Sequence, residues 1–203
     1  MRTLHHGSWL LALEGIDGCG KSTQARLLCE ALRGRGLEAV VFREPGDSAH
    51  GDAIRQLFSE GRSLSAREEM RLFLEDRRID VHDNILPSLK RGAVVIMDRY
   101  YFSSMAYQGA QGIPVDEIRE ANESFAPRPD LTLVLDVAPS TGLARILARH
   151  DEPNSFEEEE QLAEARRLFL SFCSGDIRFI NAALSTAEVH LEILEMVLVR
   201  IAG

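Results

Sequence analysis

Short apolar runs alternate along this chain with longer segments in which apolar residues recur every three or four positions. The short runs predict buried strands at residues 9–14, 40–43, 93–98 and 131–137. The periodic segments predict helices at 22–33, from Ser65 to beyond Arg77, and at 114–125, 141–150, 156–172 and 188–201. Strands that alternate with helices in this way are typical of an α/β fold with a doubly wound parallel sheet.

Composition and charge narrow the class of protein. The 203 residues are 45% hydrophobic, which suits one domain over residues 1–203 and excludes a fibrous or disordered chain. The formal net charge of −9 leaves no basic surface of the kind that a nucleic-acid polymer needs as a partner. An acidic stretch at 151–160 is usually a solvated surface, and we expect it to form part of a short lid at about 145–160.

The cysteines indicate a reducing compartment. Cys19, Cys29 and Cys173 are odd in number and lack C-x-x-C spacing, which argues against a disulfide framework and a zinc site. No apolar run suits a signal peptide or approaches the ~20 residues of a membrane span, so we expect a cytoplasmic protein without a membrane partner. Cys19 is either a small filler or, beside a helix N-terminus and Lys21, the most reactive thiol.

The most specific motif follows the first predicted strand. Residues 15–22 read GIDGCGKS and satisfy the phosphate-loop pattern G-x-x-x-x-G-K-[ST] between a strand and a helix. Its glycines let backbone N–H groups face an anion, Lys21 is expected to present an exposed positive charge, and Ser22 offers a hydroxyl to Mg²⁺. A glycine-rich turn that binds nothing is the alternative, but Lys21 is one of only two lysines in the chain. The pattern predicts a P-loop fold in which ATP contacts Gly15, Ile16, Asp17, Gly18, Cys19, Gly20, Lys21, Ser22 and Thr23.

A carboxylate and an arginine end the third predicted strand. Asp98 could hold Mg²⁺ through water and so help to neutralise transferring phosphates; the alternative is an N-cap for a helix near Ser103. Arg99 follows at once, and ligands of open parallel sheets bind at this carboxyl edge. The pair therefore indicates a phosphate site.

Arg77 interrupts an apolar stripe on the helix that begins at Ser65. A buried guanidinium needs partners, so it should meet either an internal carboxylate or a planar hydrogen-bonding ligand. Phe73 lies one turn earlier on the same face. The two side chains could clamp a nucleobase, with the ring stacking and the guanidinium donating to a carbonyl; an internal ion pair is the open alternative.

Together these motifs resemble the bacterial thymidylate kinase family over nearly the whole chain. The matching segments are EGIDGCGKST at 14–23, REPG at 43–46, LF and DR at 72–77, DRYYFSSMAYQG at 98–109 and PDLTLVLDV at 129–137. The resemblance implies a nucleotide-kinase type of P-loop fold and transfer of the γ-phosphate of ATP to dTMP with Mg²⁺. It also implies a homodimer.

The resemblance assigns roles residue by residue. It implies that Phe73 stacks on thymine, Arg77 donates to an exocyclic oxygen, and Ser104 and Gln108 complete the base pocket. Asp17 would reach the sugar hydroxyl and Tyr107 would close on the sugar. Arginines would surround the acceptor phosphate, and the bond before Pro45 would be cis. The full set expected at the acceptor is Arg43, Glu44, Pro45, Arg55, Phe73, Arg77, Arg99, Ser103, Ser104, Tyr107 and Gln108.

The chain departs from the family in its lid. Residues 154–157 read NSFE where many relatives have DRFE, so an expected arginine is absent, and Gly18 stands where other relatives place one. We expect Arg149 rather than Arg145 to supply the cation, because it adjoins the acidic stretch. The predicted catalytic set is Lys21, Arg99, Asp17 and Arg149, with Ser22 and Asp98 at the metal. A kinase for another nucleoside or nucleotide and a catalytically weak ATP-binding homologue remain the alternatives.

Overall fold

The computed structural model describes residues 7–60, 64–148 and 159–202. Its described strands form one parallel sheet in the order β2-β3-β1-β4-β5. The strands are β1 (Trp9–Glu14), β2 (Ala39–Arg43), β3 (Val94–Asp98), β4 (Leu131–Asp136) and β5 (Ile177–Asn181). The predicted α/β class with a parallel sheet is therefore confirmed.

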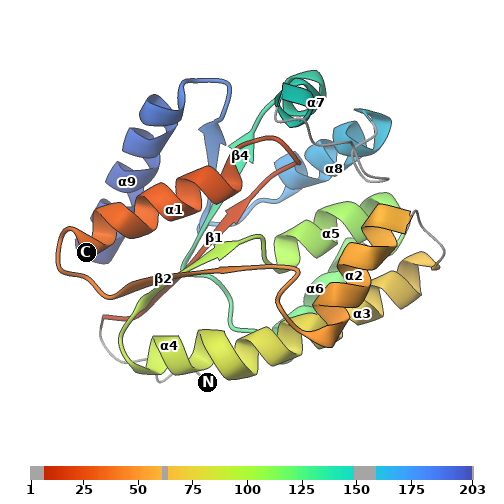
Figure 1. Ribbon diagram of the computed structural model, residues 1–203, viewed down its shortest axis with the longest axis horizontal. Coiled ribbons are helices and arrows are strands. Elements are labelled where there is room, and N and C mark those ends of the chain that lie inside the picture. The colour runs from red at the N-terminus through yellow and green to blue at the C-terminus, as the bar shows by residue number, and fades with distance from the viewer. Residues whose placement is uncertain (1–6, 61–63, 149–158, 203) are drawn as a thin grey trace.

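Helices cover both faces of the sheet (Figure 1). α1 (Lys21–Arg33) and α9 (Thr186–Ala202) lie together on one face. The other face carries α3 (Ala66–Asp80), the π-helix η1 (Val81–Ile85), α4 (Leu86–Lys90), α5 (Tyr101–Ala110), α6 (Val115–Glu123) and α8 (Glu159–Ser171). α2 (Ala49–Glu60) packs on α3, and α7 (Pro139–Ala148) packs on α8. Because β3 is fully buried and β1 and β4 nearly so, these strands read as continuous apolar runs.

Local signals locate most element boundaries. α3 begins where its capping box predicts, since Glu68 N donates to Ser65 Oγ at 3.3 Å and Ser65 N donates to Glu68 Oε2 at 2.9 Å. Two elements escaped prediction. β5 is an edge strand in which only Ile177 and Ile180 are buried, and α2 starts within a polar, glycine-containing stretch.

The sheet determines where a ligand can bind. The loop after β1, Arg43 at the end of β2 and Asp98 at the end of β3 all lie at the carboxyl edge, with Arg43 and Asp98 in register. Ligands of open parallel sheets bind at such an edge. Among the described helices, none has the length and apolar character needed to cross a membrane.

Candidate active site

The loop between β1 and α1 folds as a phosphate loop because glycines occupy its tightest positions. Gly15 has φ +130, and a Cβ there would lie 2.4 Å from the carbonyl oxygen of Leu135. Gly18 has φ +76, and its Cβ would lie 2.2 Å from the carbonyl oxygen of Gly142 in α7. A side chain at position 18 therefore has no room in this structure.

Lys21 is buried, with 5% of its surface exposed, so the expectation of an exposed lysine was wrong. Its ammonium folds back onto the loop and donates to the carbonyl oxygens of Gly15 and Ile16, both at 2.9 Å. It also lies 3.5 Å from the Sγ of Cys19. The loop carbonyls that curl inward thus hold the cation at the base of the loop.

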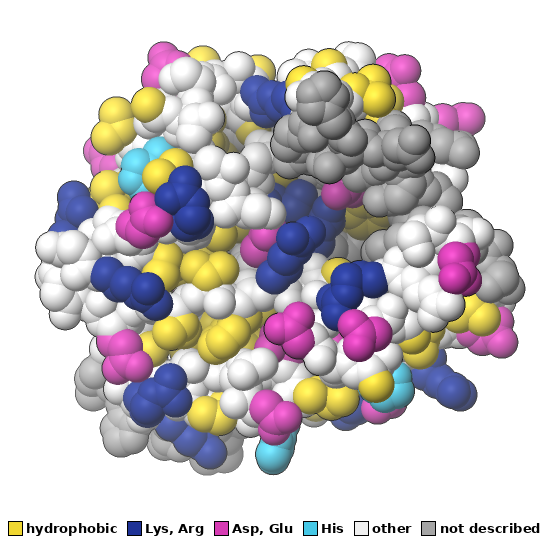
Figure 2. Space-filling view, in the orientation of Figure 1, with side chains coloured by type: hydrophobic (Ala, Val, Ile, Leu, Met, Phe, Trp, Pro, Cys, Tyr) yellow, Lys and Arg dark blue, Asp and Glu magenta, His cyan; other side chains and the backbone are white. Residues whose placement is uncertain are grey.

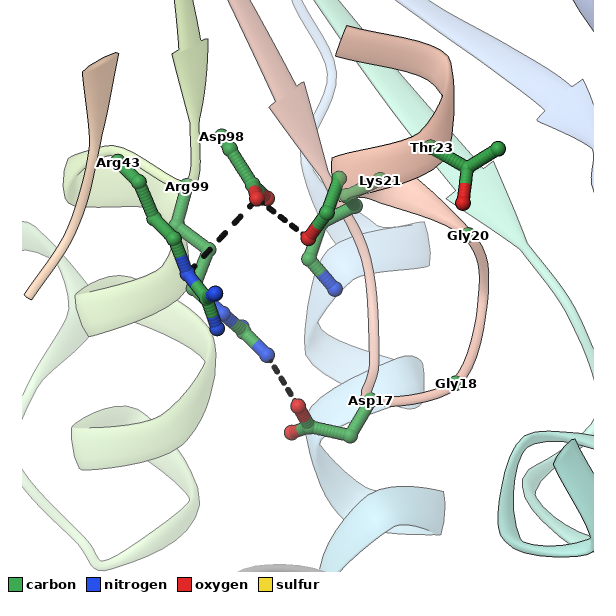
Figure 3. Close-up of a pocket in the computed structure, with 9 residues that line it drawn as sticks. Asp17, Gly18, Gly20, Lys21, Thr23, Arg43, Asp98 and Arg99 are labelled. Carbon is green, nitrogen blue, oxygen red and sulfur yellow. Dashed lines mark hydrogen bonds and ion pairs between the residues drawn. The ribbon is translucent and has the colours of Figure 1, made fainter. Parts of the chain in front are cut away.

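Ser22 and Asp98 both line the cleft, and Figure 3 shows Asp98 between Arg43 and the start of α1. Ser22 Oγ donates to Asp98 Oδ2 at 2.5 Å, and Arg43 Nε lies 3.8 Å from the same oxygen. The N-cap alternative for Asp98 was wrong, because the N-cap of α5 is Tyr100 and no side chain caps that end. A hydroxyl and a carboxylate are hard oxygen donors of the type that Mg²⁺ accepts, and the described residues contain no cluster of three metal-binding side chains.

Arg99 links the loop to α5. Its backbone has φ 72, and its Nη2 donates to Asp17 Oδ1 at 2.5 Å. Tyr107 donates its hydroxyl to the other oxygen of Asp17 at 2.7 Å. Burial by itself would raise the pKa of Asp17, but the positive charges of Arg99 and Lys21 lower that pKa to about 2. Asp17 therefore presents an ionised acceptor to the cleft.

The three arginines expected around an acceptor phosphate do not all converge. Arg43 and Arg99 line the cleft together with Asp17, Lys21 and Asp98, whereas Arg55 does not line it. Arg55 Nη1 instead donates to the carbonyl oxygens of Pro45 at 3.1 Å and Gly46 at 2.8 Å, and its Nη2 pairs with Asp52. On the face of the molecule drawn in Figure 2, Lys and Arg side chains gather around a hollow near the middle.

Arg77 forms the internal ion pair that the sequence left open. It is 1% exposed, and its Nε donates to both oxygens of Glu44 at 2.9 Å. Its Nη1 donates to Asn122 Oδ1 at 2.5 Å, while Ser104 Oγ lies a longer 3.3 Å from Nη1 and from Nη2. Burial raises the pKa of Glu44 to about 7, although the guanidinium lowers it. The peptide bond between Glu44 and Pro45 is cis, as expected.

The other expected base-pocket residues lie on α3, which carries Arg77, and on α5. Ser104 and Gln108 are buried on α5, and Phe73 is half-buried on α3, one turn before Arg77. Gln108 Nε2 donates to Glu69 Oε1 at 2.7 Å. Its Oε1 is buried and has no hydrogen-bond partner among the described residues. A buried acceptor of this kind marks a place where a ligand donor fits.

Sequence reasoning missed three buried polar residues that organise the site. Glu14 accepts from the backbone N–H of Tyr100 and the hydroxyl of Ser103. Asp76 holds the loop after β2 by accepting from Gly46 N at 2.8 Å, and Asn122 is the partner of Arg77. A signal existed for two of them, because Glu14 ends an apolar run and Asn122 lies four residues after Ile118 on the same helix face.

The expected lid is only partly visible. Arg149 and most of the segment at 145–160 lie outside the described residues, whereas Arg145 is half-buried on α7. Arg166 on α8 is engaged elsewhere, since it pairs with Asp136 through contacts of 2.6 and 2.9 Å.

The cysteines differ in accessibility. Cys19 is 3% exposed, so its selection as the most reactive thiol is not supported by access. Cys29 is also buried, and Cys173 is exposed. The accessible thiol is therefore Cys173.

Comparison with known proteins identifies relatives over almost the whole chain. The sequence model of the family described as thymidylate kinase matches residues 13–193. A thymidylate kinase of Xylella fastidiosa is 49% identical over 189 residues, which cover 93% of this chain and 86% of the relative. A probable thymidylate kinase of Archaeoglobus fulgidus is 45% identical over 188 residues, covering 93% and 94% of the two chains. A thymidylate kinase of Xanthomonas campestris is 46% identical over 183 residues, covering 90% of this chain and 80% of its own. A match of this extent, on a fold whose phosphate loop and buried arginine lie at one edge of the sheet, places the chain in the thymidylate kinase family.

Proposed function

We infer that this protein transfers the γ-phosphate of ATP to dTMP and so supplies dTDP for nucleotide biosynthesis. The observation that carries the inference is that relatives named thymidylate kinase match over 93% of the chain. The family model covers residues 13–193, which include every residue that lines the cleft. Geometry supports it, because the phosphate loop lines a cleft at the carboxyl edge of the sheet, and the buried polar cluster around Arg77 includes Glu44, which follows β2 at that edge. Phosphoryl transfer needs this arrangement more than it needs a strong base.

At the donor end, we propose that residues 15–23 hold the ATP phosphates. The N-terminus of α1 and the loop N–H groups provide an anion site, and Lys21 would leave the loop carbonyls to meet the outer phosphates. Ser22 and Asp98 would hold Mg²⁺, which contributes charge neutralisation when bound. Arg43 and Arg99, which line the cleft beside them, suit the acceptor phosphate, and Asp17 with Tyr107 suits the sugar.

The base pocket favours thymine by the direction of its hydrogen bonds. Thymine presents a ring N–H donor beside carbonyl acceptors, which complement the unpartnered Oε1 of Gln108 and the weakly engaged N–H groups of Arg77 near Ser104. Cytosine presents an amino donor in place of one carbonyl and would face the guanidinium with hydrogen instead of a lone pair. Phe73 would stack on the base.

Further proposals rest on the sequence and on the family. Arg149 would supply a cation to the transferring phosphate, and an Arg149→Ala variant should lose turnover on the order of 10²-fold with dTMP affinity nearly unchanged. Loss of turnover in Arg145→Ala instead would reverse that assignment.

The chain would act as a single domain in a cytoplasmic homodimer. Light scattering on the purified protein tests the dimer, because it measures the molar mass of the particle in solution.

A coupled ADP-release assay with dTMP, dUMP, dCMP and dGMP tests the function. We expect dTMP to be the preferred acceptor. Preference for another acceptor would support a different nucleotide kinase, and ATP binding without turnover of any acceptor would support a catalytically weak homologue.

A matched pair of variants on α5 tests the base pocket. Gln108→Leu should raise the KM for dTMP by about 5- to 100-fold, because a buried base donor would lose its acceptor. Gln111→Leu is the control, since Gln111 also donates to Glu69, at 3.2 Å, but is only half-buried. Equal effects of the two variants would contradict the role of Gln108.

A further inference from the structure

Glu14 is a fully buried carboxylate beside the phosphate loop to which the proposed function gives no task. It is the last residue of β1, and both its oxygens are engaged by the start of the segment after β3. The backbone N–H of Tyr100 donates to Oε1 at 2.8 Å, and Ser103 Oγ donates to Oε2 at 2.6 Å. The side chain thus connects β1 with the turn that carries Arg99.

The hydrogen bonds around Glu14 have a defined direction. Burial raises the pKa of Glu14 to about 7, although Ser103, Arg99 and Lys21 lower it. In its ionised form the carboxylate only accepts, so the hydroxyl hydrogen of Ser103 is then committed to Glu14 and the lone pairs of Ser103 face elsewhere. Arg99 Nη1 donates to Ser103 Oγ at 3.3 Å, and Arg99 Nη2 donates to Asp17. The order of donation is therefore Arg99 to Ser103 to Glu14, so one terminal nitrogen of the guanidinium is held through Ser103 and the other by Asp17.

Glu14 also supports the backbone of Arg99. The φ of 72 at this residue lies in the left-handed region, which an arginine adopts only when its surroundings impose it. Two adjacent hydrogen bonds to β1 hold the backbone in this conformation: Arg99 N donates to Leu13 O at 3.1 Å, and Tyr100 N donates to Glu14. The backbone and the side chain of Arg99 are both held by the end of β1.

We propose that Glu14 is a positioning residue that aims Arg99 at the nucleoside monophosphate acceptor through Ser103 and the N–H of Tyr100. This inference rests on the proposed function, because it assumes that Arg99 contacts the acceptor. Replacing the carboxyl group by an amide of the same shape should therefore weaken acceptor binding and leave ATP binding unchanged.

Glu14→Gln tests the proposal in the full-length enzyme. The amide oxygen can still accept from Tyr100, but the amide nitrogen would donate to Ser103 and compete there with Arg99. We expect the KM for dTMP to rise about 10-fold and the KM for ATP to stay within twofold. Asp130→Asn is the matched control, because Asp130 accepts from Leu10 N at the opposite end of the same strand, and both of its KM values should stay at the wild-type level.

A double-mutant cycle with Ser103→Ala separates positioning from general stabilisation. If Glu14 acts through Ser103, the double variant should weaken dTMP binding no more than the stronger single variant does. Three results would each overturn the proposal. The effects of the two substitutions on the KM for dTMP could multiply in the double variant, the KM for dTMP could stay unchanged in Glu14→Gln, or the KM values for dTMP and ATP could rise equally. If Glu14→Gln does not fold, Ser103→Ala alone decides, since an unchanged KM for dTMP in that variant also breaks the proposed link.

The wild-type assay keeps this proposal distinct from the proposed function. Absence of dTMP turnover in the wild-type enzyme would refute the function itself. An active wild type whose Glu14→Gln variant binds dTMP normally would refute only the role of Glu14.

Discussion

Replacing Arg77 by alanine should destabilise the fold as well as weaken dTMP binding. Arg77 and Glu44 expose 1% and 3% of their side chains, so the substitution leaves a buried carboxylate without its counter-charge. Asn122 Oδ1 also loses its donor. Removing one partner of a buried ion pair lowers the free energy of unfolding by about 3–5 kcal/mol. For a chain of this size, that loss lowers Tm by about 6–20 °C.

The loss of stability in Arg77→Ala should become larger as the pH rises. Burial already raises the pKa of Glu44 to about 7 with the guanidinium present, and removing Arg77 raises it further. At a pH above the ordinary pKa of glutamate, Glu44 then keeps its proton in the folded variant but has released it in the unfolded chain. The stability of the variant therefore falls as pH rises. The difference in Tm between wild type and Arg77→Ala should therefore be larger at pH 8 than at pH 6.

Thermal and urea unfolding followed by circular dichroism at the two pH values measures this effect. Arg78→Ala is the control: Arg78 is its neighbour on α3, is 47% exposed, and pairs with Glu75 at 4.0 Å. We expect a change under about 1 kcal/mol for that surface pair. If Arg77→Ala unfolds like Arg78→Ala, the argument from the buried pair is wrong.

dTMP affinity, measured where both proteins are folded, decides whether Arg77 also reads the base. Loss of a charged hydrogen bond should weaken dTMP binding by about 1.5–3 kcal/mol while leaving ATP binding unchanged. Lower stability with unchanged dTMP affinity would restrict Arg77 to a structural role and refute its proposed contact with thymine.

The remaining predictions concern the phosphate loop and its neighbours. Lys21→Ala should abolish phosphate transfer in a steady-state assay, and unchanged activity would refute the assignment of the loop. Gly142→Ala should lower stability by about 1–3 kcal/mol, because its Cβ would lie 2.5 Å from a loop carbonyl oxygen, whereas Gly175→Ala, with nothing within 4 Å, should not; equal Tm values would contradict the packing argument. A thiol reagent should modify Cys173 before Cys19 and leave activity intact, as peptide mass spectrometry and an assay of the labelled enzyme can establish; earlier labelling of Cys19 would show that the loop opens.

Local patterns in the sequence determined the class of fold and the position of the phosphate loop. A buried parallel strand is a continuous apolar run, a helix start is signalled within four residues, and the phosphate loop is one uninterrupted motif. These features depend on neighbours in the chain, so β1, the capping box at Ser65 and the loop at 15–22 could be predicted without coordinates.

Only the tertiary structure decided how the buried charges are paired. Arg77 meets Glu44 and Asn122, which lie 33 and 45 residues away, and Glu14 meets Tyr100 across 86 residues. No local period encodes such distances, because a buried polar group takes whichever partner the packing of strands and helices brings within reach. For the same reason the sequence indicated a lysine in the loop but not that its ammonium would be buried against the carbonyls of Gly15 and Ile16.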